Sequence, residues 1–333
     1  MQASDEDLQV IAITGAAGFI GSNLAHRLAG LGHHLFLVDH PFSAAKASNW
    51  VGLNRFCFAT EIMFLDALRS RNLPIDVIFH LGACSSTTES DWEFLLWNNV
   101  KFSQAIWTWC AEAECPLYYA SSAATYGDGS LGFDDRTPPG NLRPLNLYGK
   151  SKNDFDLWIW SRIAEGLPAP PSWGGLKFFN VYGPREDHKG SMASVVWKAR
   201  REILATGSVS LFKSTHPAYR DGGQKRDFVF VEDCIDHLLW LREHPEVSGL
   251  FNSGTGTART FEDLAGAVFR ALDREPRIRL IDMPPEIERQ YQNFTQADMS
   301  KLRGAGFTKP PTSLEDGVSQ TLEVEARRLI AGD

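Results

Sequence analysis

QVIAITGAAGFIGSNLAHRLAGLG, residues 9 to 32, is the stretch that decides the fold. It starts with a short apolar run, passes through Gly15, Gly18 and Gly21, and continues with helix-forming residues that end at a glycine. Glycines at such a junction allow a tight turn between strand and helix and a close approach of the backbone to a ligand. The stretch therefore predicts a buried strand, a turn suited to phosphate groups, and a helix whose N-terminus faces that turn.

The same order of elements recurs along the first half of the chain. Further apolar strands are predicted at 34–40, 76–83, 116–122 and 176–183, with helices near 92–114 and 145–166 between them. Apolar strands that alternate with helices indicate a parallel sheet covered on both faces, whose ligands bind at the carboxyl ends of the strands. The sequence thus predicts an α/β protein with a Rossmann-type, doubly wound parallel sheet.

The alternation fades after residue 184, which predicts a smaller lobe interleaved with the sheet. This part contains a loop rich in proline, glycine and charge at 213–226, the strand FVFVEDC at 228–234, a helix at 260–272, a strand at 277–283 and a helix at 314–329. We expect residues 8–183 with 228–274 to form the Rossmann domain. Residues 184–227 with 275–330 are expected to form a C-terminal substrate-binding lobe.

The composition is that of a soluble protein without a strongly basic surface. The 333 residues are 43% hydrophobic and 22% charged, and the formal net charge of −8 argues against nucleic acid or an anionic membrane as the main partner. The five cysteines lack metal-ligand spacing and favour reduced thiols, so no metal site is predicted. The acidic N-terminus is unlike a secretory signal, and no apolar run approaches the roughly 20 residues needed to cross a bilayer. We expect a cytoplasmic protein.

Asp39 closes the second predicted strand, where an acid commonly accepts hydrogen bonds from the adenosine ribose of a dinucleotide. A carboxylate at this place normally favours NAD over NADP. Lys46, seven residues further on, could offset the acid and pair with a 2′-phosphate. The local sequence therefore predicts a nicotinamide dinucleotide and leaves the choice between NAD and NADP open.

Tyr148 and Lys152 lie in NLYGKSK (146–152), four residues apart and hence on one face of a helix. A free tyrosine has a pKa near 10, which a neighbouring ammonium and a positively charged nicotinamide would lower. Ser122, at the end of a predicted strand, can hydrogen-bond the hydroxyl or carbonyl that is interconverted. Together these residues predict the acid–base group of an enzyme that transfers hydride.

The order TGAAGFIG, SSAATYG and YGKSK resembles the extended short-chain dehydrogenase/reductase superfamily. Within that superfamily, several segments resemble the ADP-L-glycero-D-manno-heptose 6-epimerase family. They are GACSSTTE (82–89), SSAATYG (121–127), FFNVYGPRE (178–186), HKGSMASV (188–195), KRDFVFVED (225–233) and FTQAD (294–298). The match runs from about residue 9 to residue 325, and HKGSMAS and GACSSTTE are its most specific parts.

This resemblance implies an isomerase that inverts the sixth carbon of ADP-D-glycero-D-manno-heptose, on the pathway to the lipopolysaccharide inner core. The inversion would proceed by transient oxidation to a ketone and return of the same hydride. The family also implies a tightly bound NADP that is regenerated in each turnover, and a homo-oligomer, suggested to be a pentamer. The resemblance therefore favours NADP as the cofactor, with NAD as the alternative.

The resemblance also implies the site residues. The implied cofactor contacts are Gly15, Gly18, Phe19, Ile20, Gly21, Asp39, His40, Lys46, Leu81, Gly82, Ala83, Cys84, Ser85, Asn98, Lys152, Val181 and Lys189. The implied substrate contacts are Ser122, Asn180, Ser191, Lys198, Phe212, Lys213, Ser214, Thr215, Arg226 and Tyr291. For Arg226, which could hold a diphosphate, a surface ion pair with Asp227 is the alternative.

Lys189 follows the turn at Gly183 and Pro184, in a run of charged residues. Inversion through a ketone exposes both faces of one carbon, and a proton-transfer group needs hydrogen-bond reach of roughly 2.6–3.2 Å to each hydroxyl. We therefore hypothesise that Tyr148 and Lys189 serve opposite epimers. From spacing alone, the alternative that Lys189 only anchors phosphate or cofactor is favoured; the resemblance favours two acid–base groups.

The chain departs from the family pattern at three places. Glu61 stands where the family more usually has a cofactor-contacting lysine, and Lys198 where a substrate-contacting histidine is common. The loop at 214–225 is several residues longer than expected, which puts the preference for the nucleotide base in doubt.

Two other functions stay open from the sequence. A 4-epimerase acting on a UDP-hexose would use the same catalytic group, and a non-catalytic NADP-binding sensor would keep the fold. A dehydratase is disfavoured, because an Asp-Glu pair would have to follow Ser122, and Ala123, Ala124 and Thr125 stand there instead.

Overall fold

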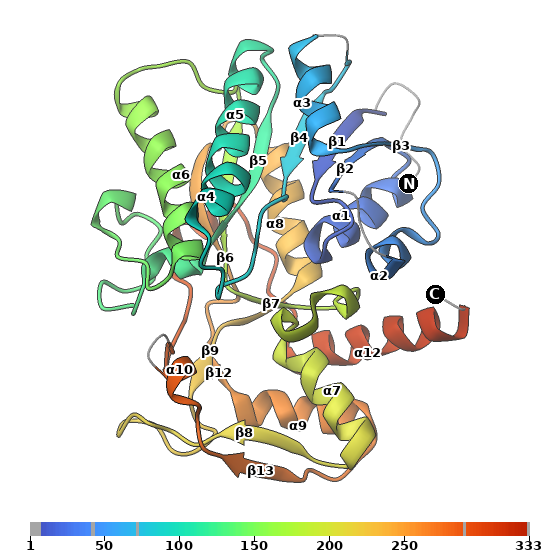
Figure 1. The fold of residues 1–333 in the computed structure, drawn as a ribbon, viewed down its shortest axis with the longest axis vertical. Helices are drawn as coiled ribbons and strands as arrows, with labels where there is room; N and C mark the ends of the chain where they lie inside the picture. The colour runs from blue at the N-terminus through green and yellow to red at the C-terminus, as the bar shows by residue number, and fades with distance from the viewer. Residues whose placement is uncertain (1–7, 41–43, 71–72, 289–290, 332–333) are drawn as a thin grey trace.

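The computed structural model describes residues 8–40, 44–70, 73–288 and 291–331. Its centre is a parallel sheet of seven strands in the order β11-β6-β5-β4-β1-β2-β3 (Figure 1). The strands are β1 (Val10–Thr14), β2 (His34–Val38), β3 (Phe56–Ala59), β4 (Val77–His80), β5 (Leu117–Ser122), β6 (Trp173–Phe178) and β11 (Gly249–Ser253). The strand order reverses between β1 and β4, which is where ligands of doubly wound sheets bind. The predicted fold class is confirmed.

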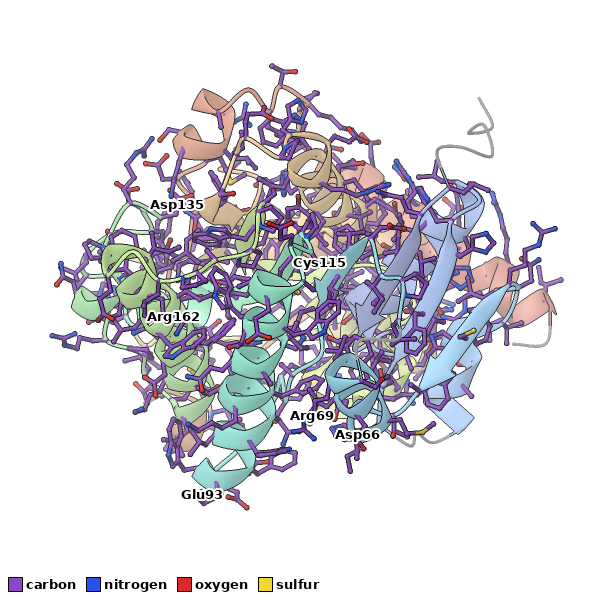
Figure 2. The ribbon with its side chains drawn as sticks, turned by 90° about the horizontal axis from the view of Figure 1, so that it is seen from above. Asp66, Arg69, Glu93, Cys115, Asp135 and Arg162 are labelled. Atoms are coloured by element: carbon purple, nitrogen blue, oxygen red, sulfur yellow. The ribbon has the colours of Figure 1, made fainter. Side chains whose placement is uncertain are left out.

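Helices cover both faces of the sheet because the apolar residues of each strand point alternately to the two sides. Ile11 and Ile13 of β1 belong to the core cluster that includes residues of α1 and α8, and Ala12 belongs to the cluster that includes residues of α3, α5 and α6. These helices are α1 (Phe19–Gly30), α3 (Glu61–Arg69), α5 (Phe102–Glu112), α6 (Leu147–Ala164) and α8 (Val231–Glu243). Figure 2 shows α3, α5 and α6 next to one another, with the labelled Arg69 on α3 and Arg162 on α6.

Small paired strands and further helices lie beside the seven-stranded sheet. The strand pairs are β7 (Asn180–Tyr182) with β10 (Phe228–Phe230), β9 (Lys225–Arg226) with β12 (Arg259–Thr260), and β8 (Val209–Phe212) with β13 (Ile278–Ile281). The further helices are α7 (Val195–Thr206), α9 (Phe261–Ala271), α10 (Pro285–Glu288), α11 (Ser300–Gly304) and α12 (Leu314–Ala331). Although α9 falls inside the segment 228–274 expected to belong to the Rossmann domain, it packs against α7 and α12 (Figure 1).

The remaining helical segments are short. They are α2 (Ala44–Ala47), η2 (Ser48–Trp50), α4 (Trp92–Leu95), η3 (Leu96–Lys101), η4 (Ala123–Tyr126), η5 (Pro139–Asn141) and η6 (Asp187–Met192). The helix predicted near 92–114 is thus continuous in sequence but contains a π-helical segment at η3. Among the described residues, no helix combines the length and apolar character needed to span a membrane.

The structure corrects two predicted strands. The single strand expected at 176–183 is broken into β6 and β7, because both neighbours of β6 end level with Phe178. The chain then leaves the sheet, and Asn180 N donates to Asp227 O at 3.1 Å to begin the pairing with β10. The strand FVFVEDC is also shorter than predicted, since α8 starts at Val231. Strands β3, β8, β11 and β12 were not predicted.

Candidate active site

The turn after β1 leaves room for a ligand only because its glycines lack side chains. Gly15 has φ +65°, and a Cβ there would lie 2.7 Å from the backbone of Gly82. A Cβ on Gly21 would lie 2.2 Å from Gly15 O. Gly18 is the N-cap of α1 and no side chain caps that helix end, so its amide groups stay available to an anion. The turn fits the diphosphate of a dinucleotide.

Gly21→Ala should therefore destabilise the chain by about 1–3 kcal/mol, since the added methyl group forces the turn apart. We also expect weaker retention of the dinucleotide. Gly30→Ala in the same helix is the matched control, because nothing lies within 4 Å of a Cβ there. Thermal unfolding with and without added dinucleotide measures both effects. A Gly21→Ala chain as stable as Gly30→Ala would contradict the steric role.

Asp39 joins the end of β2 to this turn. It is buried, and its Oδ2 accepts a hydrogen bond from Ala17 N at 2.8 Å. Its Oδ1 accepts from Lys46 Nζ at 2.9 Å. Both carboxylate oxygens are thus engaged by the chain, and the negative charge of Asp39 is balanced by Lys46.

The loop after β4 is fixed through buried hydrogen bonds to β1. Thr14 Oγ1 accepts from Gly82 N at 3.0 Å and lies 2.7 Å from His80 Nδ1. His80 Nε2 lies 2.8 Å from Ser103 Oγ, whose own hydrogen goes to Asn99 O. Burial lowers the pKa of His80 to about 3 and the nearby Lys152 acts in the same direction, so the imidazole is neutral. His80 is therefore a positioning residue.

Asn99, in the π-helical segment η3, ties that loop to α6. Its side chain accepts from Cys84 N at 2.8 Å and donates to Cys84 O at 3.0 Å and to Ser151 Oγ at 2.8 Å. Ser151 Oγ in turn donates to Tyr148 O at 2.7 Å. Such π-helical segments often occur at functional sites. Here the segment holds the first turn of α6 against the loop that carries Cys84, while Asn98 lines the cleft.

The predicted acid–base residues meet at the carboxyl end of β5. Asn146 caps α6 by accepting from Gly149 N at 2.8 Å, which places Tyr148 in the first turn. Burial raises the pKa of the Tyr148 phenol, and its hydrogen bond with the Ser122 side chain acts in the opposite direction. Lys152 is buried, donates from Nζ to Ala120 O at 3.0 Å, and has its pKa lowered by burial to about 8.

Lys189 is held at the cleft by Glu186. Its Nζ donates to Glu186 Oε2 at 3.2 Å and lies 4.7 Å from the centre of the Phe19 ring. The fully buried Glu186 also accepts from Ser194 N at 2.7 Å and from Gly183 N at 3.3 Å. The loop after β7 thus places an ammonium over the first residue of α1.

Arg226 brings a buried positive charge to the lobe side of the cleft. Its guanidinium lies 4.8 Å from the centre of the Tyr291 ring and 5.6 Å from that of Phe261. Within the described part of the chain no carboxylate lies at ion-pair distance from it, since the side chain of Asp227 accepts from backbone N–H groups instead. Burial lowers the pKa of Arg226, as expected of a cation that lacks a counter-ion. Arg226 is suited to bind a phosphate group.

One cavity of about 870 Å³ lies at the carboxyl ends of the strands, and Asp39, Tyr148, Lys152, Lys189 and Arg226 all line it. All predicted catalytic and cofactor residues line it, as do Asn180, Lys198, Arg226 and Tyr291 of the predicted substrate contacts. The predicted contacts that do not line it are Ser191, Phe212, Lys213, Ser214 and Thr215. The cavity therefore joins a dinucleotide turn, an acid–base group and several cations.

Residues 11–254 match the NAD dependent epimerase/dehydratase family. The chain belongs to this family. A protein of Nitratidesulfovibrio vulgaris named ADP-L-glycero-D-manno-heptose-6-epimerase is 47% identical over 326 residues, which cover 96% of this chain and 98% of the relative. The resemblance expected from the motifs is confirmed.

Solved structures of similar proteins agree with this family. The crystal structure of the Helicobacter pylori ADP-L-glycero-D-manno-heptose-6-epimerase is 28% identical, with a TM-score of 0.81 over 97% of this chain and 98% of that one. The structure of MoeE5 in complex with UDP-glucose and NAD is 25% identical, with a TM-score of 0.75 over 96% of this chain and 99% of that one. The family and these structures support a nicotinamide dinucleotide as the cofactor.

Some predicted substrate contacts of this epimerase/dehydratase lie outside the cleft, because the loop at 214–225 and the residues next to it form hydrogen bonds and ion pairs with other parts of the chain. Lys213 Nζ pairs with Asp282 Oδ1 at 2.9 Å on the surface. Ser214 N donates to Asp221 Oδ1 at 2.8 Å, and Arg220 forms an ion pair with Glu262. The roles of these residues stay predictions.

Sequence reasoning missed two residues that shape the site. Glu186 stands three residues before Lys189, a spacing that brings side chains together on a helical turn, so a local signal was present. Asn49 donates to Ala17 O at 3.0 Å and lies 3.1 Å from His188 Nδ1. It is 32 residues from Ala17, and no local pattern indicates such a contact.

Proposed function

We propose that the protein inverts the sixth carbon of ADP-D-glycero-D-manno-heptose to give the L-glycero epimer. The observation that carries this proposal is that two proton-transfer side chains, Tyr148 and Lys189, reach one cleft from different elements. The names of the relatives supply the substrate. The proposal includes NADP as cofactor, a place in lipopolysaccharide inner-core synthesis, a cytoplasmic location and a homo-oligomer, suggested to be a pentamer. It also includes the division into a Rossmann domain and a substrate-binding lobe.

The chain's own residues divide the chemistry among them. When bound, the nicotinamide supplies the hydride acceptor and donor. One of the two groups, Tyr148 Oη or Lys189 Nζ, takes the hydroxyl proton of the epimer that is oxidised, and the other gives a proton to the ketone oxygen as the opposite epimer forms. The two groups exchange roles in the reverse direction, since one fixed group lacks the reach to both positions. Ser122 Oγ orients the oxygen that is interconverted, and the Lys152 ammonium stabilises negative charge on the Tyr148 oxygen.

Two cations fit the diphosphate of the sugar nucleotide. Arg226 offers a planar set of donors, and Lys198 adds an ammonium whose pKa is lowered by burial and by the nearby Lys189. Neither forms an ion pair with a carboxylate of the described residues. Holding the diphosphate would leave the heptose end of the substrate free to present either face.

The decisive experiment supplies ADP-D-glycero-D-manno-heptose to the purified chain and determines the configuration of the sixth carbon by NMR. We expect inversion with full retention of a deuterium label at that carbon. Solvent deuterium at the inverted carbon would rule out return of the same hydride. Inversion of UDP-galactose instead would favour a 4-epimerase, and a bound dinucleotide without turnover of either substrate would favour a sensor.

Lys189→Met is expected to lower the rate of epimerisation by about 10²-fold while NADP stays bound. The loss is moderate because the Lys189 side chain is 20% exposed, so water can replace part of the proton transfer. The measurement is the rate constant at saturating substrate, together with the NADP content of the purified variant.

Lys150→Met is the matched control for this substitution. Lys150 lies in the YGKSK segment between Tyr148 and Lys152, but it is exposed and paired with Asp154 on the surface. We expect wild-type turnover for it. If Lys189→Met loses NADP yet keeps its rate once NADP is saturating, Lys189 is an anchor and the hypothesis of two acid–base groups is wrong.

A further inference from the structure

A second set of paired charges lies at the carboxyl end of β2, and the proposed chemistry does not use it. His40 directly follows Asp39, and its Nδ1 lies 2.9 Å from Oε2 of Glu61. Glu61 is the first residue of α3, where the positive end of the helix dipole stabilises a carboxylate. Asp39, His40, Lys46 and Glu61 all line the cleft that Gly15 also lines.

The negative charge of Asp39 is already offset by the chain. An acid at this place normally disfavours a 2′-phosphate because of its negative charge. Here Lys46 Nζ lies 2.9 Å from one carboxylate oxygen, and the backbone N–H of Ala17 donates to the other at 2.8 Å. Because Lys46 offsets the charge of Asp39, the net charge next to the expected ribose depends on the His40–Glu61 pair.

His40 is the group in this set that changes charge near neutral pH. When it is protonated, two cations balance the two carboxylates; when it is neutral, one negative charge remains uncompensated. The hydrogen bond to Glu61 raises the pKa of His40, Asp39 acts in the same direction, and burial and Lys46 oppose them. His188 also lines the cleft, but burial, with Lys46 and Lys189, lowers its pKa to about 4, so it stays neutral in this range.

We propose that His40, held in place by Glu61, selects a dinucleotide that carries a 2′-phosphate over one that lacks it, and that this selection weakens as His40 loses its proton. The inference rests on the proposed dinucleotide site and names the residue that discriminates within it. His40 is suited to this task because its side chain is 54% exposed and can reach a ligand, whereas that of Glu61 is 17% exposed and fixed against it.

The test measures binding without any sugar substrate. The full chain loaded with NADP is equilibrated with increasing NAD at several pH values, and the bound nucleotides are quantified. The ratio of NADP to NAD affinity should fall about five-fold as the pH rises through the pKa of His40. His40→Asn should abolish this fall. Glu61→Gln should move it to lower pH, since the imidazolium loses its charged partner.

The 2′-phosphate itself titrates near pH 6, and this contribution is common to all variants. The comparison with His40→Asn therefore isolates the imidazole. Equal profiles for the wild-type chain and His40→Asn would overturn the proposal, and so would a profile unchanged in Glu61→Gln. A chain that shows the expected binding profile but inverts no ADP-heptose would support the inference and contradict the proposed function, so the two failures are distinguishable.

Discussion

Tyr148→Phe is expected to lower the rate of epimerisation by about 10³–10⁴-fold and to leave the bound dinucleotide unchanged. Phenylalanine keeps the ring and its packing, so only the proton-transfer oxygen is lost. Tyr148 lines the cleft together with Ser122 and the buried Lys152. The effect should exceed that of Lys189→Met because the buried Lys152 ammonium supports negative charge on the Tyr148 oxygen, whereas the Lys189 ammonium is paired with the Glu186 carboxylate.

The two acid–base groups make a sharper test possible than a rate alone. Each epimer should depend on one of them for removal of its hydroxyl proton. With one epimer supplied at a time, reduced nicotinamide should form in Tyr148→Phe with only one epimer, and in Lys189→Met with only the other. The same epimer reacting in both variants would contradict the division of roles, and near wild-type turnover in Tyr148→Phe would remove Tyr148 from the chemistry.

Tyr118→Phe provides the control for losing a tyrosine hydroxyl. The Tyr118 hydroxyl lies away from the cleft, where it is 2.9 Å from Ser172 Oγ and donates to Leu241 O at 3.1 Å. Its removal should cost about 1 kcal/mol of folding free energy. The rate at saturating substrate should stay that of the wild-type chain.

Local spacing was enough to predict the parallel sheet, apart from its edge strands β3 and β11, and the centre of the site. Gly18 and Gly21 are required by contacts with Gly15 O within one turn, Gly15 has a positive φ of +65°, and Tyr148 and Lys152 share a face of one helix. The structure brings these residues together because β1 and β5 end, and α1 and α6 begin, at the same edge of the sheet. Residues that lie within one helix, or within one turn between a strand and a helix, have positions relative to one another that follow from their spacing in sequence. Such motifs can therefore be recognised without the structure.

What the sequence did not predict depends on contacts between distant segments. The break after Phe178 follows from where β5 and β11 end, which the strand itself does not encode. The place of α9 depends on its packing against α7 and α12. Lys177 is the last but one residue of the otherwise apolar strand β6, and nothing beside it in sequence indicates its partner, Asp156 of α6.

That partner makes Lys177 the centre of a buried polar network behind the acid–base group. Lys177 Nζ donates to Asp156 Oδ2 at 2.6 Å and to Thr125 Oγ1 at 2.9 Å, with both charged side chains almost fully buried. Asp156 also accepts from Tyr119 Oη at 3.0 Å and from Ser121 Oγ at 2.6 Å. The network joins α6, which carries Tyr148 and Lys152, to the end of β5.

Lys177→Met should reduce the free energy of unfolding by about 3–5 kcal/mol, because it leaves Asp156 buried without its counter-charge. Adding Asp156→Asn should restore most of the loss, since an amide oxygen still accepts hydrogen bonds and carries no charge. Lys150→Met breaks an exposed pair with Asp154 on the same helix and should cost about 0.5 kcal/mol or less. Urea unfolding of the three variants measures these differences. If Lys177→Met were no less stable than Lys150→Met, the buried pair would not be what fixes α6 against β5.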